Sequence, residues 1–332
     1  MRKLINDPEH FVDEMIDGLL LAHAEMLKPA SEDRRALVRT DAPTGNKVGI
    51  VTGGGSGHLP LFLGYVGRGL CSGVAIGNVF SSPSADQVWA ATRAVDSGAG
   101  VLYVYGNYGG DVLNFDLASE LADAEGIVTR TVVVTDDVAS APADRAHERR
   151  GIAGLFYVYK CAGAAAERGD SLEQVADVAR AAVAATASMG VGLSPTILPS
   201  AGQATFQLDE GEMEIGIGIH GEPGVHRGVL ETADEVTERL LGAISEDLKL
   251  SPGDRVSVLV NGMGATPLEE LYVMYRRAAR ILGELGVEIY RPYVGEFATS
   301  LEMAGASISV IRLDDRLGEL LDAPAQSPFF RQ

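Results

Sequence analysis

The chain has 332 residues, 46% of them hydrophobic and only 6% aromatic, which predicts a globular protein with a large core of Ala, Val, Leu and Ile. It carries 46 Asp and Glu against 27 Lys and Arg, and this formal charge of −19 argues against a nucleic-acid partner because it repels phosphate backbones. No apolar run approaches the ~20 residues of a membrane span, and charged residues stand near the start where a signal peptide needs its apolar region. Together with two cysteines that lack metal-type spacing, these features predict a cytoplasmic protein with no membrane partner.

The first half of the chain alternates helical and strand-like segments. Residues 8–28 repeat apolar positions at helical spacing and predict a helix. Apolar strand-like runs follow, separated in part by helical patterns, and they lie within residues 46–58, 70–79, 99–111 and 128–139. This alternation predicts an open, mostly parallel sheet, in which ligands bind beyond the carboxyl ends of the strands.

The pattern changes in the second half of the chain. In order it predicts a pair of Ala-rich helices, an irregular stretch, a strand followed by a long helix, and a strand followed by a short helix, at residues 151–190, 205–227, 254–286 and 307–321. We therefore predict an α/β protein of two α/β domains, with mostly parallel or mixed sheets flanked by helices. The expected boundary separates residues 1–188 from residues 189–332.

One apolar run leads into a glycine-rich segment, VTGGGSGHLP, at residues 51–60. A P-loop would need Lys and Ser or Thr after the last glycine, and the dinucleotide fingerprint and the nucleophile elbow would need glycine where His58 stands. Two interpretations are left. The segment is either a loop whose main-chain N–H groups surround ligand oxygens beside a proton-moving imidazole, or a strand-to-helix turn with a hydrogen-bonded histidine.

Two further segments place an ionisable side chain beside glycines. Asp111 follows two glycines in YGNYGGDVLNF, where a strand should end and a helix begin, so it is either a functional acid or a helix N-cap. In MEIGIGIHGEPG, taken as a strand, Gly216, Gly218 and His220 share one face, which leaves room beside the imidazole for a ligand or another backbone. Close packing would explain the glycines but not the histidine. No pair of the six histidines has the spacing of zinc ligands, so no metal site is predicted.

Several segments, in this order, resemble the substrate-binding subunit of dihydroxyacetone kinase, the DhaK family, nearly from end to end. They are GGGSGH, GNYGGDVLNF, TDDVA, RRGIAG, GIGIHGEPG, NGMGATPLEELY and TSLEMAGASISV. The resemblance implies the DhaK-like α/β fold and a homodimer. It also implies that this subunit holds a short-chain ketose while a separate nucleotide-binding subunit, of the DhaL type, delivers the phosphoryl group.

The resemblance implies roles for individual residues as well. His220 corresponds to the family histidine that binds the ketone carbon covalently as a hemiaminal. His58 and Asp111 correspond to the residues that orient the hydroxyl to be phosphorylated and remove its proton. The substrate-binding positions correspond to Gly55, Ser56, Gly57, His58, Gly106 and Asp111. No cofactor is implied on this chain, because ATP or ADP with Mg belongs to the partner subunit.

The sequence departs from the family pattern at two places. Family members that act on dihydroxyacetone commonly carry Lys where Gly106 stands and an acid where Leu59 stands. Loss of the Lys side chain opens volume and removes a hydrogen-bond donor, so we expect an acceptor larger than dihydroxyacetone, such as erythrulose or a branched ketose.

The main alternative to a kinase subunit is a ketose sensor or transcriptional coactivator of the same fold, without turnover. The presence of His58, Asp111 and His220 together favours the kinase, because a sensor has little need of a proton acceptor. A complete one-chain kinase is not expected, since only a short tail follows residue 315.

Overall fold

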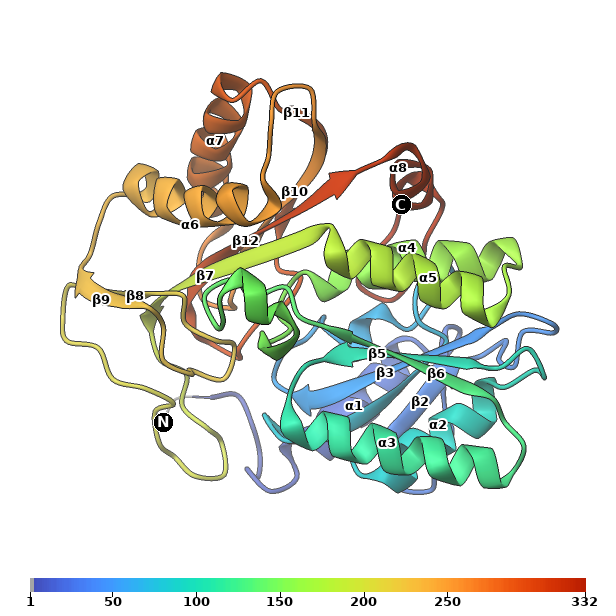
Figure 1. Ribbon diagram of the computed structural model, residues 1–332. Helices are drawn as coiled ribbons and strands as arrows, with labels where there is room; N and C mark the ends of the chain where they lie inside the picture. The colour runs from blue at the N-terminus through green and yellow to red at the C-terminus, as the bar shows by residue number, and fades with distance from the viewer. Residues whose placement is uncertain (1–2) are drawn as a thin grey trace.

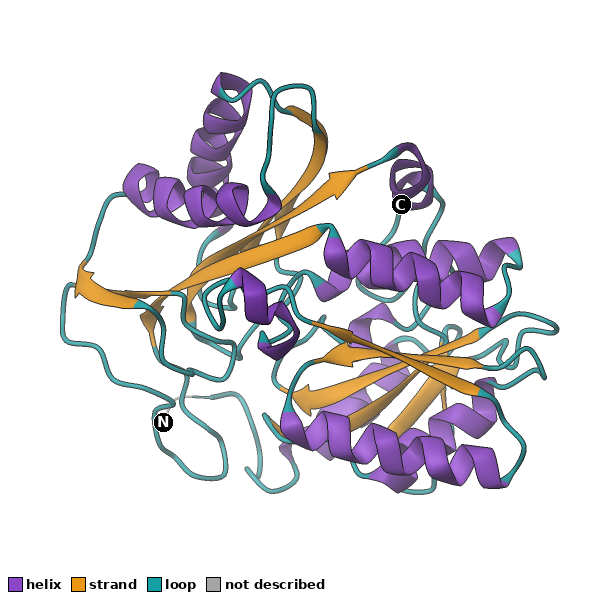
Figure 2. Ribbon diagram, viewed as in Figure 1, coloured by secondary structure: helices purple, strands orange, loops and turns teal. Residues whose placement is uncertain are grey.

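The computed structural model describes residues 3–332, which form two mixed six-stranded sheets with helices packed on them (Figures 1 and 2). The first sheet has the strand order β1-β2-β4-β3-β5-β6. Its central strands β3, β4, β5 and β6 pair in parallel, whereas β1 and β2 add an antiparallel edge. The strands are β1 (Leu27–Pro29), β2 (Ala36–Arg39), β3 (Gly49–Ser56), β4 (Gly73–Val79), β5 (Val101–Gly106) and β6 (Thr129–Val134).

Helices cover both faces of the first sheet. Helices α2 and α3 share one apolar cluster with the sheet, and α1, α4 and α5 pack on the opposite face. Local sequence sets the start of two of these helices, because Ser84 and Ser171 each form a capping box with a glutamine three residues later. The helices are α1 (Phe11–Ala22), α2 (Ala85–Val95), α3 (Gly109–Ala124), α4 (Leu155–Arg168) and α5 (Leu172–Ala184).

The second sheet has the order β11-β10-β12-β7-β8-β9, and β10–β11 is its parallel pair. Helices α6 (Ala233–Leu248) and α7 (Leu268–Glu284) cover one face, and α8 (Asp315–Asp322) packs against α4. The strands are β7 (Thr186–Ser194), β8 (Glu212–Ile215), β9 (His226–Val229), β10 (Arg255–Gly262), β11 (Glu288–Gly295) and β12 (Ala304–Leu313). No helix within residues 3–332 has both the length and the apolar character that crossing a bilayer demands.

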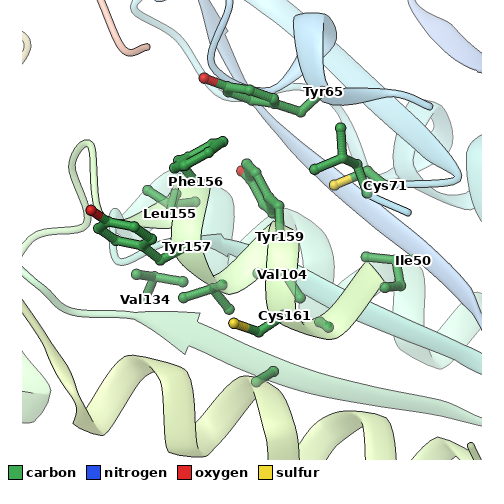
Figure 3. Packing of buried hydrophobic residues seen from close by; sticks show 14 of the residues in the cluster. Ile50, Tyr65, Cys71, Val104, Val134, Leu155, Phe156, Tyr157, Tyr159 and Cys161 are labelled. Atoms are coloured by element: carbon green, nitrogen blue, oxygen red, sulfur yellow. The ribbon is translucent and has the colours of Figure 1, made fainter. Parts of the chain in front are cut away.

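Helix α4 joins the two halves of the molecule. Every residue from Leu155 to Ala166 is buried, and the rings of Phe156 and Tyr159 lie against Tyr65 from the first half (Figure 3). Two hydroxyl contacts tie α4 to both sheets. Tyr159 lies 2.7 Å from the Thr52 hydroxyl of β3, and Tyr157 lies 3.0 Å from the Ser257 hydroxyl of β10. Most side chains of this segment are apolar or aromatic, as expected of a helix buried on every side, and the exception, Lys160, donates to the Leu320 and Ala323 carbonyls.

The predicted α/β architecture of mixed sheets flanked by helices is the one observed, but two elements differ from expectation. The helix expected over residues 8–28 covers only Phe11–Ala22, because the chain turns after His23 and enters β1. The strand expected through Gly216 and Gly218 to His220 is wrong beyond Ile215. Gly216 has φ +80°, a left-handed conformation that ends the strand and starts an irregular loop.

The predicted boundary between residues 188 and 189 falls inside β7, which begins at Thr186. The largest apolar cluster also contains residues of both sheets, for example Ile50 and Val104 from the first and Leu259 from the second. Division of the chain into two domains therefore stays a prediction, whereas the division into two sheets is observed.

Candidate active site

The glycine-rich segment is the end of strand β3 and not an open loop. Gly53, Gly54 and Gly55 all lie within the strand, where each faces a neighbouring segment at very short range. A Cβ atom on Gly55, for instance, would stand 2.6 Å from the Ser81 backbone nitrogen. Ser56 donates its hydroxyl to the Gly77 carbonyl at 2.8 Å. Close packing thus accounts for these glycines: Gly53 faces Ala75 of β4, Gly54 faces the Phe62 ring, and Gly55 faces the segment after β4.

His58 is 1% exposed and is held from both sides. Its Nδ1 lies 2.8 Å from the Thr299 carbonyl oxygen, so this nitrogen carries the proton and donates it. The Phe80 ring stacks on the imidazole at 4.7 Å between centroids. Burial, together with the charge of His220, lowers the pKa of His58 to about 3. His58 is therefore neutral near pH 7, with a free lone pair on Nε2.

His220 meets His58 although it lies in a different half of the chain. The two Nε2 atoms are 3.0 Å apart. On the other side of the His220 ring, Nδ1 lies 2.8 Å from Glu222 Oε1, and the His220 backbone nitrogen donates to Glu222 Oε2 at 2.9 Å. Burial of the Glu222 carboxyl opposes ionisation, but these contacts with His220 outweigh it and lower the pKa of Glu222 to about 2. Glu222 is therefore a carboxylate that accepts the Nδ1 proton of His220.

The hydrogen bonds fix where the protons of this pair lie. Nδ1 of His58 donates to a carbonyl and Nδ1 of His220 donates to a carboxylate, so neither of these protons is available to the Nε2 atoms. Two bare lone pairs 3.0 Å apart would repel each other, so one further proton lies between them. Because burial lowers the pKa of His58 to about 3, its Nε2 keeps its lone pair and is the acceptor in this contact. On the other side of the ring, His220 Nδ1 lies 2.8 Å from the Glu222 carboxylate, which accepts its proton.

Asp111 lies in the first turn of α3 and is 5% exposed. The N-cap of the helix is Tyr108, with no side-chain cap bond, so the capping interpretation of Asp111 is wrong. Within the described part of the chain, its Oδ1 has no hydrogen-bond partner. Burial raises the pKa of Asp111 to about 6, although the Ser82 hydroxyl and the charge of His220 oppose this rise. A buried carboxylate with an unpaired oxygen and this pKa is suited to accept a proton near neutral pH.

Tyr108 separates Gly106 from the histidine pair. Gly106 is the last residue of β5, and a Cβ there would stand 3.2 Å from both the Tyr108 ring and the Gly151 carbonyl oxygen. The Tyr108 hydroxyl donates to that same carbonyl at 3.1 Å, and its ring meets the His220 ring edge-on at 4.8 Å. A larger side chain at Gly106 would therefore push against the Tyr108 ring, which packs on the His220 ring.

The structure brings His58 and His220 into direct contact, and Asp111 lies close enough for the charge of His220 to act on it. The residue patterns of the sequence did not single out Glu222, Thr299, Phe80 or Tyr108. Glu222 had a signal, because it stands two residues after His220 in the quoted GIHGEPG segment, and Thr299 lies at the start of another quoted segment. Phe80 carries no such signal. Across residues 3–332, no group of three His, Cys, Asp or Glu side chains is placed to hold a metal ion.

Comparison with known proteins gives a consistent result. The family model described as the Dak1 domain matches residues 17–329. A dihydroxyacetone-binding subunit DhaK of a PTS-dependent dihydroxyacetone kinase from Listeria innocua is 47% identical over 331 residues, which cover 100% of this chain and 99% of the relative.

Two other matches bear on the choice of function. A D-erythrulose kinase from Mycolicibacterium smegmatis is 44% identical over 100% of this chain, which spans 57% of that longer protein. A solved structure named as the dihydroxyacetone kinase operon co-activator Dha-DhaQ matches with a TM-score of 0.88 and 31% identity, over 95% of this chain and 97% of that one. These findings confirm the resemblance inferred from the motifs and the α/β fold class.

Proposed function

Because the chain belongs to the Dak1 domain family, we propose that it is the ketose-binding subunit of a dihydroxyacetone-type kinase and that it holds its substrate as a hemiaminal on His220. The observation that supports this proposal most strongly is the row formed by Glu222, His220 and His58, in which a carboxylate orients one imidazole and a second, neutral imidazole faces its reactive nitrogen. Activated nucleophiles in enzymes share this arrangement of nucleophile, base and orienting group.

The contact between the histidines supplies a balanced route to the adduct. The proton on His220 Nε2 moves to His58 Nε2, 3.0 Å away, and frees the lone pair of His220. This lone pair forms a bond to the ketone carbon, and the carbonyl π electrons move to the oxygen. The oxygen then takes the proton from His58, whose low pKa makes it a strong acid once it is protonated. The positive charge stays on the His220 ring beside the Glu222 carboxylate.

The two Nε2 atoms are too close for a ketose carbon to lie between them, so the rings separate when the substrate enters. The bound ketose then has its terminal hydroxyl within reach of Asp111, and we assign the removal of that proton to Asp111 and to the regenerated His58. Gly55, Ser56, Gly57 and Gly106 complete the proposed substrate cradle. Phosphoryl transfer demands mainly positioning of the acceptor and stabilisation of charge, and this chain contributes the positioning.

The phosphoryl donor belongs to the partner in this proposal. The Listeria relative is named as the dihydroxyacetone-binding subunit of a PTS-dependent kinase, which means that it works with other subunits. We assign ATP or ADP with Mg to a DhaL-type nucleotide-binding subunit, which docks on a homodimer of this chain, and the identity of that subunit decides whether the donor is ATP or a phosphotransferase relay.

The proposed acceptor is a ketose larger than dihydroxyacetone, with erythrulose as the leading candidate. Gly106 lacks the long cationic side chain that family members acting on dihydroxyacetone commonly carry, and a relative that is 44% identical is named a D-erythrulose kinase. The Tyr108 ring and the Gly151 carbonyl fill the space next to Gly106, so the missing hydrogen-bond donor, more than added volume, supports this proposal. A covalent bond to a ketone carbon also excludes glycerol, because a polyol has no carbonyl to attack.

The second candidate function is a ketose sensor or coactivator without turnover, and the match to the operon co-activator structure favours it. Asp111 argues for the kinase. Its carboxylate is buried, has a raised pKa and has one oxygen without a partner among residues 3–332, which costs the folded state free energy, and a sensor that only binds a ketose has no proton to remove.

Native mass spectrometry of the intact protein tests the proposal. Dihydroxyacetone, D-erythrulose, L-erythrulose and glycerol are each added to the parent protein, to His220→Ala and to His226→Ala, a matched control because His226 is exposed on β9. We expect a mass gain equal to the whole ketose in the parent and in His226→Ala, none in His220→Ala and none with glycerol.

The ketose that binds best identifies the substrate class. A strong preference for dihydroxyacetone would contradict the proposal that the acceptor is a larger ketose. Absence of an adduct with every ketose would overturn covalent capture. Capture without phosphorylation in the presence of a nucleotide-bearing partner would favour the sensor.

A further inference from the structure

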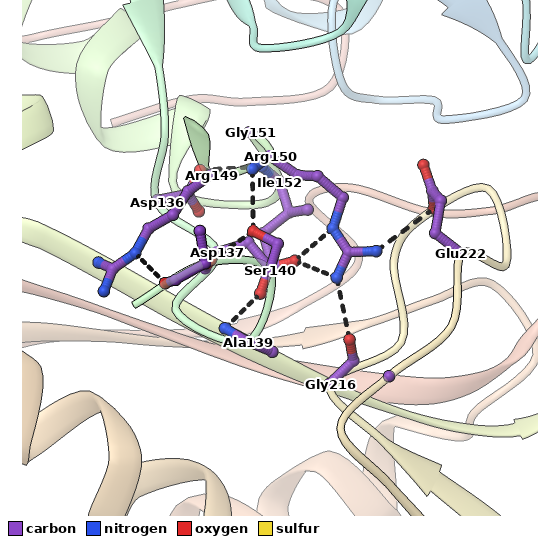
Figure 4. A network of polar contacts seen from close by, with 12 residues as sticks. Asp136, Asp137, Ala139, Ser140, Arg149, Arg150, Gly151, Ile152, Gly216 and Glu222 are labelled. Carbon is purple, nitrogen blue, oxygen red and sulfur yellow. Dashed lines mark hydrogen bonds and ion pairs between the residues drawn. The ribbon is translucent and has the colours of Figure 1, made fainter. Parts of the chain in front are cut away.

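Two charged motifs lie next to the site and have no role in the mechanism above. They are TDDVA, which contains Asp136 and Asp137 after β6, and RRGIAG, which contains Arg149 and Arg150 before α4. Their side chains form a buried polar network that extends toward the loop of His220 (Figure 4). Asp136 supports the start of α4 within this network, because it accepts the backbone N–H groups of Ile152 and Gly154 at 2.8 Å each.

Arg150 is the member that reaches the His220 loop. Its guanidinium donates to Asp137 Oδ2 through Nε at 2.9 Å, and its Nη2 lies 2.7 Å from the same oxygen. Nη2 also donates to the Gly216 carbonyl at 3.0 Å, and Nη1 lies 4.0 Å from Glu222 Oε2 (Figure 4). One side chain therefore joins a fully buried aspartate beside the first sheet to both ends of the loop that carries His220.

The backbone of the loop is shaped to admit this contact. A Cβ on Gly218 would stand 2.1 Å from Glu222 Oε2 and 2.5 Å from Arg150 Nη1, so any other residue there would push these two groups apart. Gly216 at the loop entry and Glu222 near its exit are the two points that Arg150 touches. The face that the sequence analysis left open for a ligand is thus occupied by this ion pair.

We propose that Arg150, anchored by Asp137, is a positioning residue for covalent capture: it holds the Glu222 carboxylate in the place where that group orients the His220 ring. This inference rests on the proposed function. Arg150 touches neither histidine, so it acts through Glu222, which receives both the Nδ1 proton and the backbone N–H of His220. The planar guanidinium suits this task, because its fixed N–H groups can bond a carboxylate and a carbonyl together, which a lysine ammonium does with less geometric control.

The effect on catalysis follows from geometry. If Glu222 is free to rotate, Nδ1 of His220 loses its fixed acceptor, and Nε2 is no longer aimed at the ketone carbon. Misplacement of a reacting group by about 1 Å costs about 10²-fold in rate. Partner groups that orient a histidine from outside the site have comparable importance, about 10–100-fold, at metal centres.

Arg149 offers a matched control from the same motif. It forms a bidentate pair with the half-buried Asp247 of α6, at 2.9 and 2.6 Å, and makes none of the contacts with the His220 loop named above. Loss of either arginine leaves a carboxylate without its ion-pair partner, so both variants should lose stability, and Arg150→Ala more so because Asp137 is fully buried whereas Asp247 is half-buried. Only loss of Arg150 should change the chemistry of His220.

The test measures the rate of ketose adduct formation by rapid-mixing mass spectrometry of the full chain, with erythrulose and dihydroxyacetone as probes. For Arg150→Ala we expect the rate to fall about 10²-fold, with partial recovery in millimolar guanidinium, which fills the vacated site. Arg150→Lys, which keeps the charge and folds more readily, should fall less but measurably. Arg149→Ala should capture ketose at the parent rate per folded molecule.

A second readout separates positioning from simple destabilisation. Histidine side-chain ¹⁵N spectra report the protonation of each ring nitrogen, and we expect Arg150→Lys to weaken the Nδ1–H signal of His220 without changing that of His58. In assays with the partner, the variant should raise KM for the ketose far more than it lowers kcat.

Equal capture rates in the parent, Arg150→Lys and Arg150→Ala would overturn the proposal, and so would a loss that Arg149→Ala reproduces. If the parent itself forms no adduct, the proposed function fails and this inference fails with it, which is a result distinct from capture that ignores Arg150.

Discussion

At the scale of single residues, burial shifts the pKa values of His58 and Asp111 in opposite directions. It lowers the pKa of His58 to about 3 and raises that of Asp111 to about 6, so near pH 7 the imidazole is neutral and the carboxyl is mostly ionised. Asp111 is thus ready to accept a proton, whereas His58 is a weak base that readily gives up any proton it receives. Burial of the ionised Asp111 carboxylate lowers the free energy of unfolding, because one of its oxygens has no hydrogen-bond partner in the described structure.

Replacement of Asp111 by Asn should stabilise the protein and stop phosphoryl transfer. A carboxyl whose pKa rises from 3.8 in the unfolded chain to about 6 when folded lowers stability by about 3 kcal/mol once it is fully ionised. The folded state holds the proton more tightly, so the gain of the variant should be absent below pH 4, grow between pH 4 and 6, and be complete above pH 6. Urea unfolding at pH 4, 6 and 8 checks this, and a gain that does not change with pH would contradict it.

The same pKa predicts the pH dependence of turnover. Asp111 accepts a proton only when it is ionised, so kcat of the complete kinase should fall below an apparent pKa near 6 as the pH is lowered. His58 should add no second limb above pH 4, because its pKa is about 3. A pH–rate profile with ketose at saturation measures this. A flat profile from pH 5 to 8 would remove Asp111 from the role of base.

At the scale of elements, the end of strand β4 positions the segment that walls the site. Gly77 lies in β4, and Phe80, which stacks on His58, follows three residues later with φ +54°. A Cβ on Gly77 would stand 1.8 Å from the Ser81 carbonyl oxygen, which belongs to the backbone and has no rotamer to relieve the clash. The close approach of β4 to its own following loop therefore sets the position of Phe80.

The substitution Gly77→Ala should destabilise the protein by about 1–3 kcal/mol, as overpacking does, and should also slow ketose capture because the Phe80 ring moves. Gly18→Ala is the control. Gly18 lies in α1 with open space around its missing Cβ, and this change should add about 0.5–1 kcal/mol of stability with no effect on capture. Thermal denaturation and adduct mass spectrometry measure both effects. The packing argument fails if the two variants behave alike.

At the scale of the whole molecule, the site exists only because the two sheets are held together. His58 follows β3 of the first sheet, whereas Thr299 and His220 belong to loops of the second. Helix α4 provides the rigid connection, because it is buried along most of its length and bonds to a strand of each sheet. Relative motion of the halves would separate the two histidines.

We therefore expect the chain to unfold in a single cooperative transition. Calorimetry should give a calorimetric enthalpy equal to the van't Hoff enthalpy. Tyr157→Phe, which removes the hydroxyl facing Ser257, should lower the midpoint of that one transition by the equivalent of about 1 kcal/mol. Two resolved transitions would show that residues 1–188 and 189–332 fold as independent domains.

Much of the fold could be predicted because its signals are local. Alternating apolar strands and capped helices can be recognised from a few consecutive residues, as in the Ser84 and Ser171 capping boxes. The loop of His220 was predicted as a strand because Ile215, Ile217 and Ile219 alternate with glycines, and all three isoleucines are indeed buried. The left-handed turn at Gly216 and the space taken by Arg150 and Glu222 depend on distant parts of the chain.

By itself the sequence determined the fold class, the family and the presence of His58, Asp111 and His220, since these depend on residue order and local pattern. Only the tertiary structure decided that two histidines 162 residues apart meet at their Nε2 atoms, and that Glu222 and Thr299 set their protons. It also decided that Asp111 is buried without a full set of partners. The physical reason is that pKa values and hydrogen-bond geometry depend on which groups burial brings within a few ångströms, and chain order does not specify that.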